Sequence, residues 1–323
     1  MRVQQVNWRI RPTGAAWLLA GGLTIGCSRG RSIDADLDAY RARRGNLARI
    51  DSSAPSPRGR YLSERIRLES TTGLAIDGIV IRPSAPGCFA AVLLQDGREE
   101  NSGVIGRLPL EYGNVVVLSV DYPAELPYAV ELSDFLFHSR TLRDAARTIP
   151  SAFSLGAAYL AQRGDVDSTR VAIAATSFAV PFAVIAAAAD DRFRNVALIY
   201  GAGDLSSVLA ANLPSVPRPL RRAVASGAMH SFEDFSPERF VGRIAPRPVL
   251  MVNGMDDPQM PETAVRHLYE AAQEPKTMIW LRTGHLMPTD SALIGSLIDT
   301  AFARLPVLRD TSWMPNCAPP AHR

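Results

Sequence analysis

Short runs of apolar residues recur along the chain and are separated by longer stretches with a helical pattern. The runs are rich in Val, Ile and Leu, which is typical of strands that are buried on both faces of a sheet. They lie at Phe89 to Leu94, Asn114 to Val120, Val171 to Ala175, Asn195 to Tyr200, Pro248 to Val252 and Lys276 to Leu281. This alternation predicts an α/β fold with a mostly parallel sheet and helices on both faces.

An antiparallel hairpin is expected at the N-terminal edge of the sheet. Tyr61 to Leu68 and Leu74 to Arg82 flank the turn Ser70-Thr71-Thr72-Gly73, and the pattern of two short strands around a Gly-containing turn predicts a hairpin. With it, the sheet has about eight strands. The helical stretches are expected at Leu132 to Arg163, from the end of the third buried strand to about Ala189, at Glu262 to Gln273 and at Ser291 to Leu305.

The α/β domain is expected to span residues 61–305, and the segments on either side differ from it in composition. Residues 28–60 are polar and charged, so we expect a short helix within Asp34 to Ile50 and otherwise a tether that ends in the linker Asp51 to Arg60. Residues 306–323 read as a Pro-rich tail. Inside the domain, residues 201–246 form one long irregular connection with a basic cluster at Arg218, Arg221 and Arg222. Such an insertion is either a cap over a site or an inert surface excursion.

The first 27 residues have the layout of an export signal. Arg2, Arg9 and Arg11 precede an apolar run, Gly14 to Gly26, which is too short to span a bilayer but suits a secretory signal. The run ends at Cys27, and Leu23-Thr24-Ile25-Gly26-Cys27 resembles the lipobox of bacterial lipoproteins. The resemblance implies lipidation of Cys27 and a membrane-anchored protein on the periplasmic side. The alternatives are a plain cleaved signal, with a secreted or periplasmic product, or a short uncleaved anchor.

Composition and charge exclude several classes of protein. Hydrophobic residues make up 47% and charged residues 21%, which is typical of a folded chain. The 35 basic residues exceed the 32 acidic ones only by the three Arg of the signal, so no basic surplus remains for nucleic acid. No cluster of His, Cys and acidic residues suggests a metal. Beyond Cys27 the chain has Cys88 and Cys317, which form either a disulfide or two free thiols.

Three residue types that together make a nucleophilic site each follow a separate expected strand. Ser177 stands in Ala175-Thr176-Ser177-Phe178-Ala179, between a strand and an apolar helix, where small residues leave room for a sharp turn. Asp256 and Asp257 follow the strand Pro248 to Val252, and His285 follows the strand Lys276 to Leu281. The carboxyl ends of parallel strands meet at one edge of the sheet, so the order Ser, acid, His predicts a catalytic triad there.

With these motifs the chain resembles the α/β-hydrolase superfamily over residues 61–305, in particular its esterase and dienelactone-hydrolase-like members. The most specific match is the motif that runs from Asn253-Gly254 to Pro261 and is followed by an expected helix, an expected strand and Gly284-His285. The resemblance implies Ser177 as the nucleophile, His285 as the general base and then acid, and Asp257 as the residue that orients His285. Asp256 is the alternative acid, but the spacing from Gly254 and Pro261 favours Asp257. The resemblance implies no cofactor.

The same resemblance implies an oxyanion hole of two backbone N–H groups. One would come from Phe178 and the other from Arg98 or, second, Gly97, in the turn after Phe89 to Leu94. Members of the family usually have His-Gly in this turn. This chain has Gln95-Asp96 before Gly97, and Glu99 and Glu100 follow Arg98. Acidic side chains that point toward the oxyanion would oppose its formation.

The predicted function is hydrolysis of a carboxylic ester, or of a thioester, through an acyl-enzyme on Ser177. The partner is then a small-molecule ester, and the apolar Phe178, Val180 and Phe182 would suit its acyl group. Lactones and amides stay open as substrates, and the sequence does not indicate an oligomeric state. The alternative is a non-catalytic, membrane-tethered binding protein on the same scaffold.

Overall fold

The computed structural model describes residues 32–97, 101–107, 113–126, 132–287, 290–309 and 317. The predictions that concern residues 1–27, including lipidation of Cys27, lie outside the described residues. The same holds for Arg98, Glu99 and Glu100.

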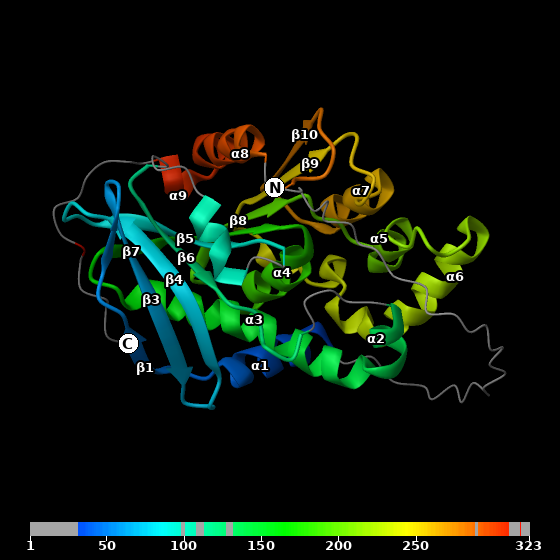
Figure 1. Cartoon of the computed structure of the whole chain (residues 1–323), viewed down its shortest axis with the longest axis horizontal. Helices are drawn as coiled ribbons and strands as arrows, with labels where there is room; N and C mark the ends of the chain where they lie inside the picture. Colours follow the sequence, from blue (N-terminus) through cyan, green and yellow to red (C-terminus); the bar gives the residue numbers. More distant parts are fainter. Residues whose placement is uncertain are drawn as a thin grey trace, which may run out of the picture.

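A ten-stranded mixed sheet forms the centre of the described chain (Figure 1). Its order is β1-β3-β4-β6-β5-β7-β8-β9-β10, with β2 paired to β3. The pairs from β1 to β6 are antiparallel, and those from β6 through β5 to β10 are parallel. The strands are β1 (Leu47–Ser52), β2 (Ser56–Arg58), β3 (Tyr61–Ser70), β4 (Ala75–Pro83), β5 (Phe89–Gln95), β6 (Val115–Val120), β7 (Val166–Thr176), β8 (Phe193–Ile199), β9 (Val249–Gly254) and β10 (Lys276–Leu281). The predicted fold class, a mostly parallel sheet with an antiparallel hairpin at its N-terminal edge, is confirmed.

Helices cover both faces of the sheet, and alternate strand residues point to each of them (Figure 1). One face packs against α1 (Ile33–Arg44), α3 (Ser139–Gln162), α4 (Val180–Ala189) and α7 (Glu262–Ala271). The other packs against α8 (Ser291–Arg304), α9 (Pro306–Arg309) and the 3-10 helix η1 (Asn101–Arg107). The helix α4 is buried at every position except Pro181, because it is apolar around its whole circumference.

The segment before residue 61 differs from the expected tether and linker. From residue 32 onward it belongs to the domain: α1 buries Leu37 and Tyr40 in the core, and β1 and β2 pair with β3. The prediction of a linker was wrong because β1 and β2 are edge strands whose side chains are nearly all exposed. Such strands need no apolar alternation, so the segment Asp51 to Arg60 carries no hydrophobic signal of its pairing.

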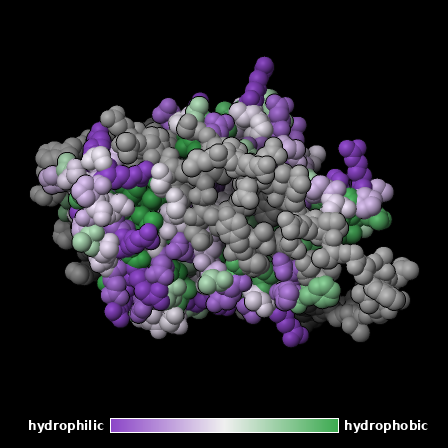
Figure 2. Space-filling view, in the orientation of Figure 1, coloured by the Kyte–Doolittle hydropathy of each residue, from purple (hydrophilic) through white to green (hydrophobic). Residues whose placement is uncertain are grey.

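Charged side chains dominate the surface of this antiparallel edge, and Figure 2 shows hydrophilic residues gathered over β1, β3 and β4. Arg67 on β3 pairs with Asp77 on β4 at 2.8 Å, and Arg49 pairs with Asp51 on β1 at 3.0 Å. Exposed ion pairs of this kind contribute little to stability. On an edge strand, however, charged side chains oppose pairing with another chain.

The connection at 201–246 is helical rather than irregular. It contains α5 (Leu205–Ala211), α6 (Arg218–Met229), η3 (His230–Phe235), η4 (Pro237–Arg239) and η5 (Val241–Ile244). In Figure 1, α5 and α6 lie together with α2 (Leu132–Phe137) at one end of the molecule. The start of the expected tail also differs from the prediction, because α9 is a short helix that buries Leu308.

Candidate active site

The nucleophile predicted from sequence stands at a sharp turn between β7 and α4. Ser177 follows the last residue of β7 directly, opens the short 3-10 helix η2 (Ser177–Ala179) and has a φ of 48°. A non-glycine residue in this left-handed region is strained, and such strain is typical of functional sites. Ala175 and Ala179, the small residues on either side, are fully buried where a larger side chain would have no room. The turn therefore has the geometry of a nucleophile elbow.

The side chain of His285 contacts that of Ser177. Ser177 Oγ lies 3.1 Å from His285 Nε2, which is within hydrogen-bond distance. The two residues are 108 positions apart in the sequence. They meet because β7 and β10 end at the same edge of the sheet.

Asp257 completes the chain of hydrogen bonds. His285 Nδ1 lies 2.7 Å from Asp257 Oδ2, and the side chain of Asp257 is only 1% exposed. The other carboxylate oxygen accepts hydrogen bonds from the backbone N–H groups of Gln259 at 2.8 Å and Met260 at 3.3 Å. Its neighbour Asp256 is exposed. The structure therefore brings together Ser177, His285 and Asp257, and of the two acids left open by the sequence it is Asp257 that contacts the imidazole.

One residue that no sequence motif indicated packs against this group. Tyr200, directly after β8, lies edge-on to the His285 ring, with 5.5 Å between the ring centroids. Its hydroxyl is 2.6 Å from Thr283 Oγ1, so it fixes the loop that carries His285. Burial, together with the nearby Asp257 carboxylate, raises the pKa of Tyr200 above its usual value and keeps the hydroxyl protonated. An aromatic residue at the carboxyl end of a predicted strand was the available signal.

A close approach of two loops holds the acid and the imidazole together. A Cβ on Gly254, the last residue of β9, would collide with the carbonyl oxygen of Thr283 and lie 2.9 Å from that of Gly284. The backbone N–H of Asp256 also donates to the Thr283 carbonyl at 3.1 Å. Glycine is therefore needed at the end of β9 for the acid loop to reach the His285 loop.

The turn after β5, expected to supply part of an oxyanion hole, is described as far as Gly97. Gln95 is fully buried and ties the end of β5 to β6: it donates to the Val120 carbonyl at 3.1 Å and accepts from Ser119 Oγ at 2.9 Å. The Asp96 carboxylate accepts a hydrogen bond from the hydroxyl of Thr176, the residue before Ser177. Gln95 and Asp96, which stand here instead of the family's usual His-Gly, therefore stabilise the site, because their side chains join neighbouring strands.

A mostly apolar cavity opens beside Ser177. Its volume is about 190 Å³, and it lies between α4 and the elements α2, α5 and η3. Phe178 and Phe182 line it as expected, but Val180 does not, because its side chain is fully buried in the core. The insertion 201–246 contributes Ala202, Leu205, Val208, Leu209, Asn212, Met229, Phe232 and Phe235 to the lining. The insertion therefore forms one wall of the cavity beside Ser177.

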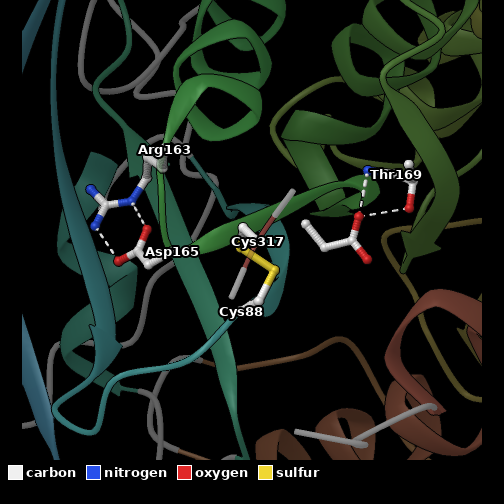
Figure 3. The surroundings of a disulfide bond; sticks show 6 residues. Cys88, Arg163, Asp165, Thr169 and Cys317 are labelled. Carbon is white, nitrogen blue, oxygen red and sulfur yellow. Dashed lines mark hydrogen bonds and ion pairs between the residues drawn. A yellow bond between two sulfur atoms is a disulfide. The ribbon is translucent and has the colours of Figure 1, made fainter. Parts of the chain in front are cut away.

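The two cysteines left open by the sequence form a disulfide in the structure (Figure 3). It joins Cys88, directly before β5, to Cys317, across 229 residues of sequence. Nearby, Arg163 and Asp165 form an ion pair at 2.7 Å. Cys88 lies at the opposite end of β5 from Asp96, so the disulfide is on the side of the sheet away from the Ser177 elbow.

Within the described part of the chain, no group of three or more His, Cys, Asp or Glu side chains is arranged to hold a metal ion. Nor does any helix among the described residues have the length and apolar character needed to cross a bilayer. The other described histidines stand apart from the triad: His138 contacts Asp134, His230 contacts Glu233, and His267 is exposed on α7.

Solved structures with the same architecture include esterases and a hydrolase. Acetyl xylan esterase 1 from Thermoanaerobacterium sp. is 17% identical, covers 82% of this chain and 92% of its own, and has a TM-score of 0.62. An acetyl xylan esterase from Paenibacillus sp. is 15% identical over 84% of this chain and 95% of its own, with a TM-score of 0.61. An alpha/beta hydrolase from Penicillium sp. is 15% identical over 75% of this chain and 99% of its own, with a TM-score of 0.52.

Comparison by sequence adds no relative. No protein-family profile matches the chain, and no curated protein matches it. At identities as low as those of the solved structures, a shared architecture does not carry an activity from one protein to another. The likeness over most of both chains does establish the architecture, and this chain has the α/β-hydrolase fold.

Proposed function

We propose that the protein is a serine hydrolase that cleaves carboxylic esters through an acyl-enzyme on Ser177. The observation that carries the proposal is the continuous chain of hydrogen bonds from Ser177 Oγ through His285 to the buried Asp257. A serine hydroxyl is a weak nucleophile until an adjacent base takes its proton, and this arrangement supplies that base. The esterase names of two structures with the same fold support the choice of ester, and the esterase and dienelactone-hydrolase-like branch is the part of the superfamily to which we assign the chain.

The reaction follows from the atoms at the site. The Nδ1–H of His285 donates a hydrogen bond to the Asp257 carboxylate, which leaves Nε2 free to accept the proton of Ser177 as Oγ attacks the ester carbonyl. The Phe178 N–H, directly after the nucleophile, would stabilise the oxyanion, with Arg98 N–H proposed as the second donor. His285 then gives its proton to the leaving alcohol. Water repeats the sequence on the acyl-enzyme and releases the acid, so the cycle needs no cofactor.

The test is turnover of a p-nitrophenyl ester by the purified protein and by its Ser177→Ala variant. We expect the variant to lose at least a thousandfold in kcat/KM while it keeps the melting temperature of the parent. A variant that hydrolyses the ester at the parental rate would rule out Ser177 as nucleophile. A parent protein that folds but hydrolyses no ester would favour the alternative, a non-catalytic binding protein.

We also propose that the protein is an exported lipoprotein anchored through Cys27. The lipobox-like sequence at Leu23 to Cys27 supports this assignment. The Cys88–Cys317 disulfide independently supports export, though not the lipid anchor, because disulfides persist in exported proteins and are rare in the cytosol. Metabolic labelling with palmitate in a bacterial host tests the proposal. The full chain should incorporate label and a Cys27→Ala variant should not, whereas label in neither would contradict lipidation.

A further inference from the structure

The cavity beside Ser177 has the lining of a hydrocarbon site. Among the described residues that line it, none is charged, and apart from Ser177 the polar ones are Asn212 and Gln259. Both N–H donors of the Asn212 side chain are already used, by the carbonyls of Val208 at 2.8 Å and Gln259 at 3.0 Å. Of the remaining polar groups, only the Asn212 side-chain oxygen and the Gln259 side chain could serve a sugar ring, so most of its hydroxyl groups would be buried without partners, which is costly. An apolar group would meet no such penalty.

Aromatic side chains form a continuous wall along this cavity. The ring of Phe178, next to the nucleophile, lies 5.3 Å from that of Phe182, which lies 6.1 Å from Phe235 in η3. Phe232 continues the series at 6.1 Å from Phe235 and reaches Phe135 of α2 at 5.2 Å. Packed aromatic rings give a rigid apolar surface with a defined size. The wall joins the elbow to the insertion, so the insertion sets how far a bound chain can extend.

The position of His285 decides which part of an ester enters the cavity. The leaving alcohol must receive its proton from His285 Nε2, so it has to lie on the imidazole side of Ser177. His285 is not among the described residues that line the cavity, whereas Ser177 and Phe178 are. The group that occupies the cavity is therefore attached to the carbonyl carbon, and it is the acyl group.

Resting on the proposed ester hydrolysis, we propose that the natural substrates are esters whose acyl group is a hydrocarbon chain of about six carbons or an aromatic ring, rather than the acetyl esters of sugars. The size follows from the volume: the cavity of about 190 Å³ exceeds the ~150 Å³ apolar cavity that takes up benzene in other proteins. An acetyl group would leave most of this space unfilled. The acyl preference thus differs from the substrate in the names of the two acetyl xylan esterases with this fold.

Two isomeric esters test the acyl assignment directly. Methyl hexanoate and pentyl acetate have the same formula, but the longer chain is on the acyl side in one and on the alcohol side in the other. Each methylene that is fully buried raises kcat/KM by about fourfold. We expect the protein to prefer methyl hexanoate by at least tenfold. Equal rates, or a preference for pentyl acetate, would overturn the proposal.

A matched pair of variants tests the cavity itself. Leu209 on α5 lines it, whereas Leu220 on α6 is 54% exposed and does not. Leu209→Trp should lower the ratio of p-nitrophenyl hexanoate to p-nitrophenyl acetate turnover at least tenfold, because the indole fills the acyl space. Leu220→Trp introduces the same side chain and should leave the ratio unchanged. Val208→Phe serves as a second lining variant if Leu209→Trp fails to fold, and an unchanged ratio in the folded lining variant would contradict the proposal.

If the protein had no esterase activity, the proposed function would be refuted, but the proposal that the cavity binds a hydrocarbon group would still need its own test. Calorimetry on the Ser177→Ala protein separates the two, because it needs no turnover. Tighter binding of p-nitrophenyl hexanoate than of p-nitrophenyl acetate, lost when Leu209→Trp is added, would support the hydrocarbon site. Equal binding of the two esters would overturn it.

Discussion

His285 Nδ1 and Asp257 Oδ2 lie 2.7 Å apart, although 28 residues and an entire helix and strand separate them in the sequence. The contact is buried, and the second carboxylate oxygen is held by two backbone N–H groups. The carboxylate is thus fixed in the orientation that keeps the Nδ1 proton of His285 toward it. That leaves Nε2 available to Ser177.

The two neighbouring acids should differ sharply in their effect on activity. Asp257→Asn keeps the shape of the side chain but no longer favours the productive tautomer of His285, so we expect kcat to fall by roughly 10³- to 10⁴-fold. Asp256→Asn changes an exposed carboxylate that the imidazole does not contact and should stay within about threefold of the parent. Steady-state kinetics on a p-nitrophenyl ester measure both, and equal losses would contradict the assignment of Asp257.

A side chain at Gly254 should separate the acid loop from the His285 loop. In Gly254→Ala the new methyl group would meet the carbonyls of Thr283 and Gly284, which are backbone atoms and cannot move independently. We expect a loss of about 1–3 kcal/mol in the free energy of unfolding and a lower kcat. Gly227→Ala is the control, because nothing lies within 4 Å of its Cβ position in α6. It should stabilise the protein by about 0.5–1 kcal/mol, and a similar response of both variants would argue against the close approach.

The disulfide should contribute to stability without contributing to catalysis. Reduction of Cys88–Cys317 releases a loop of 229 residues in the unfolded chain, and we expect it to lower stability by about 2–4 kcal/mol. Since Cys88 lies at the far end of β5 from the site, kcat should not change. Thermal melts with and without a reductant measure the first effect. A Cys88→Ser/Cys317→Ser variant should melt lower and be insensitive to the reductant, and a parent whose Tm ignores the reductant would contradict the prediction.

Alkaline pH should destabilise the protein through its buried tyrosines. Burial raises the pKa of Tyr40, Tyr159 and Tyr200 above the usual value. The folded state then holds protons that the unfolded state releases, so stability is fully present below the ordinary tyrosine pKa of about 10 and is lost as pH rises above it. Urea unfolding at about pH 8 and pH 10.5 measures the change. Tyr40→Phe should reduce the difference between the two midpoints, and a midpoint that does not fall with pH would refute the linkage.

Features that appear in the sequence as hydrophobic periodicity or motif spacing could be predicted from it. The strands from β5 to β10 are apolar runs, and Ser177, Asp257 and His285 each follow one of them, so their meeting at one sheet edge could be inferred. The edge strands β1 and β2 could not be inferred, because exposed pairing to β3 requires no apolar pattern. The contact of Tyr200 with His285 depends on the packing of two loops, and the lining of the cavity depends on how residues 201–246 fold over α4. Neither this contact nor the cavity lining can be predicted from the residues next to each other in the sequence.

If Ser177 is an activated nucleophile, it should react with a fluorophosphonate probe, and mass spectrometry of the labelled protein locates the modified residue. We expect stoichiometric modification of Ser177, which is lost in the Ser177→Ala and His285→Ala variants and after heat denaturation. A correctly folded protein that takes up no label at Ser177, or that labels equally well without His285, would contradict this expectation.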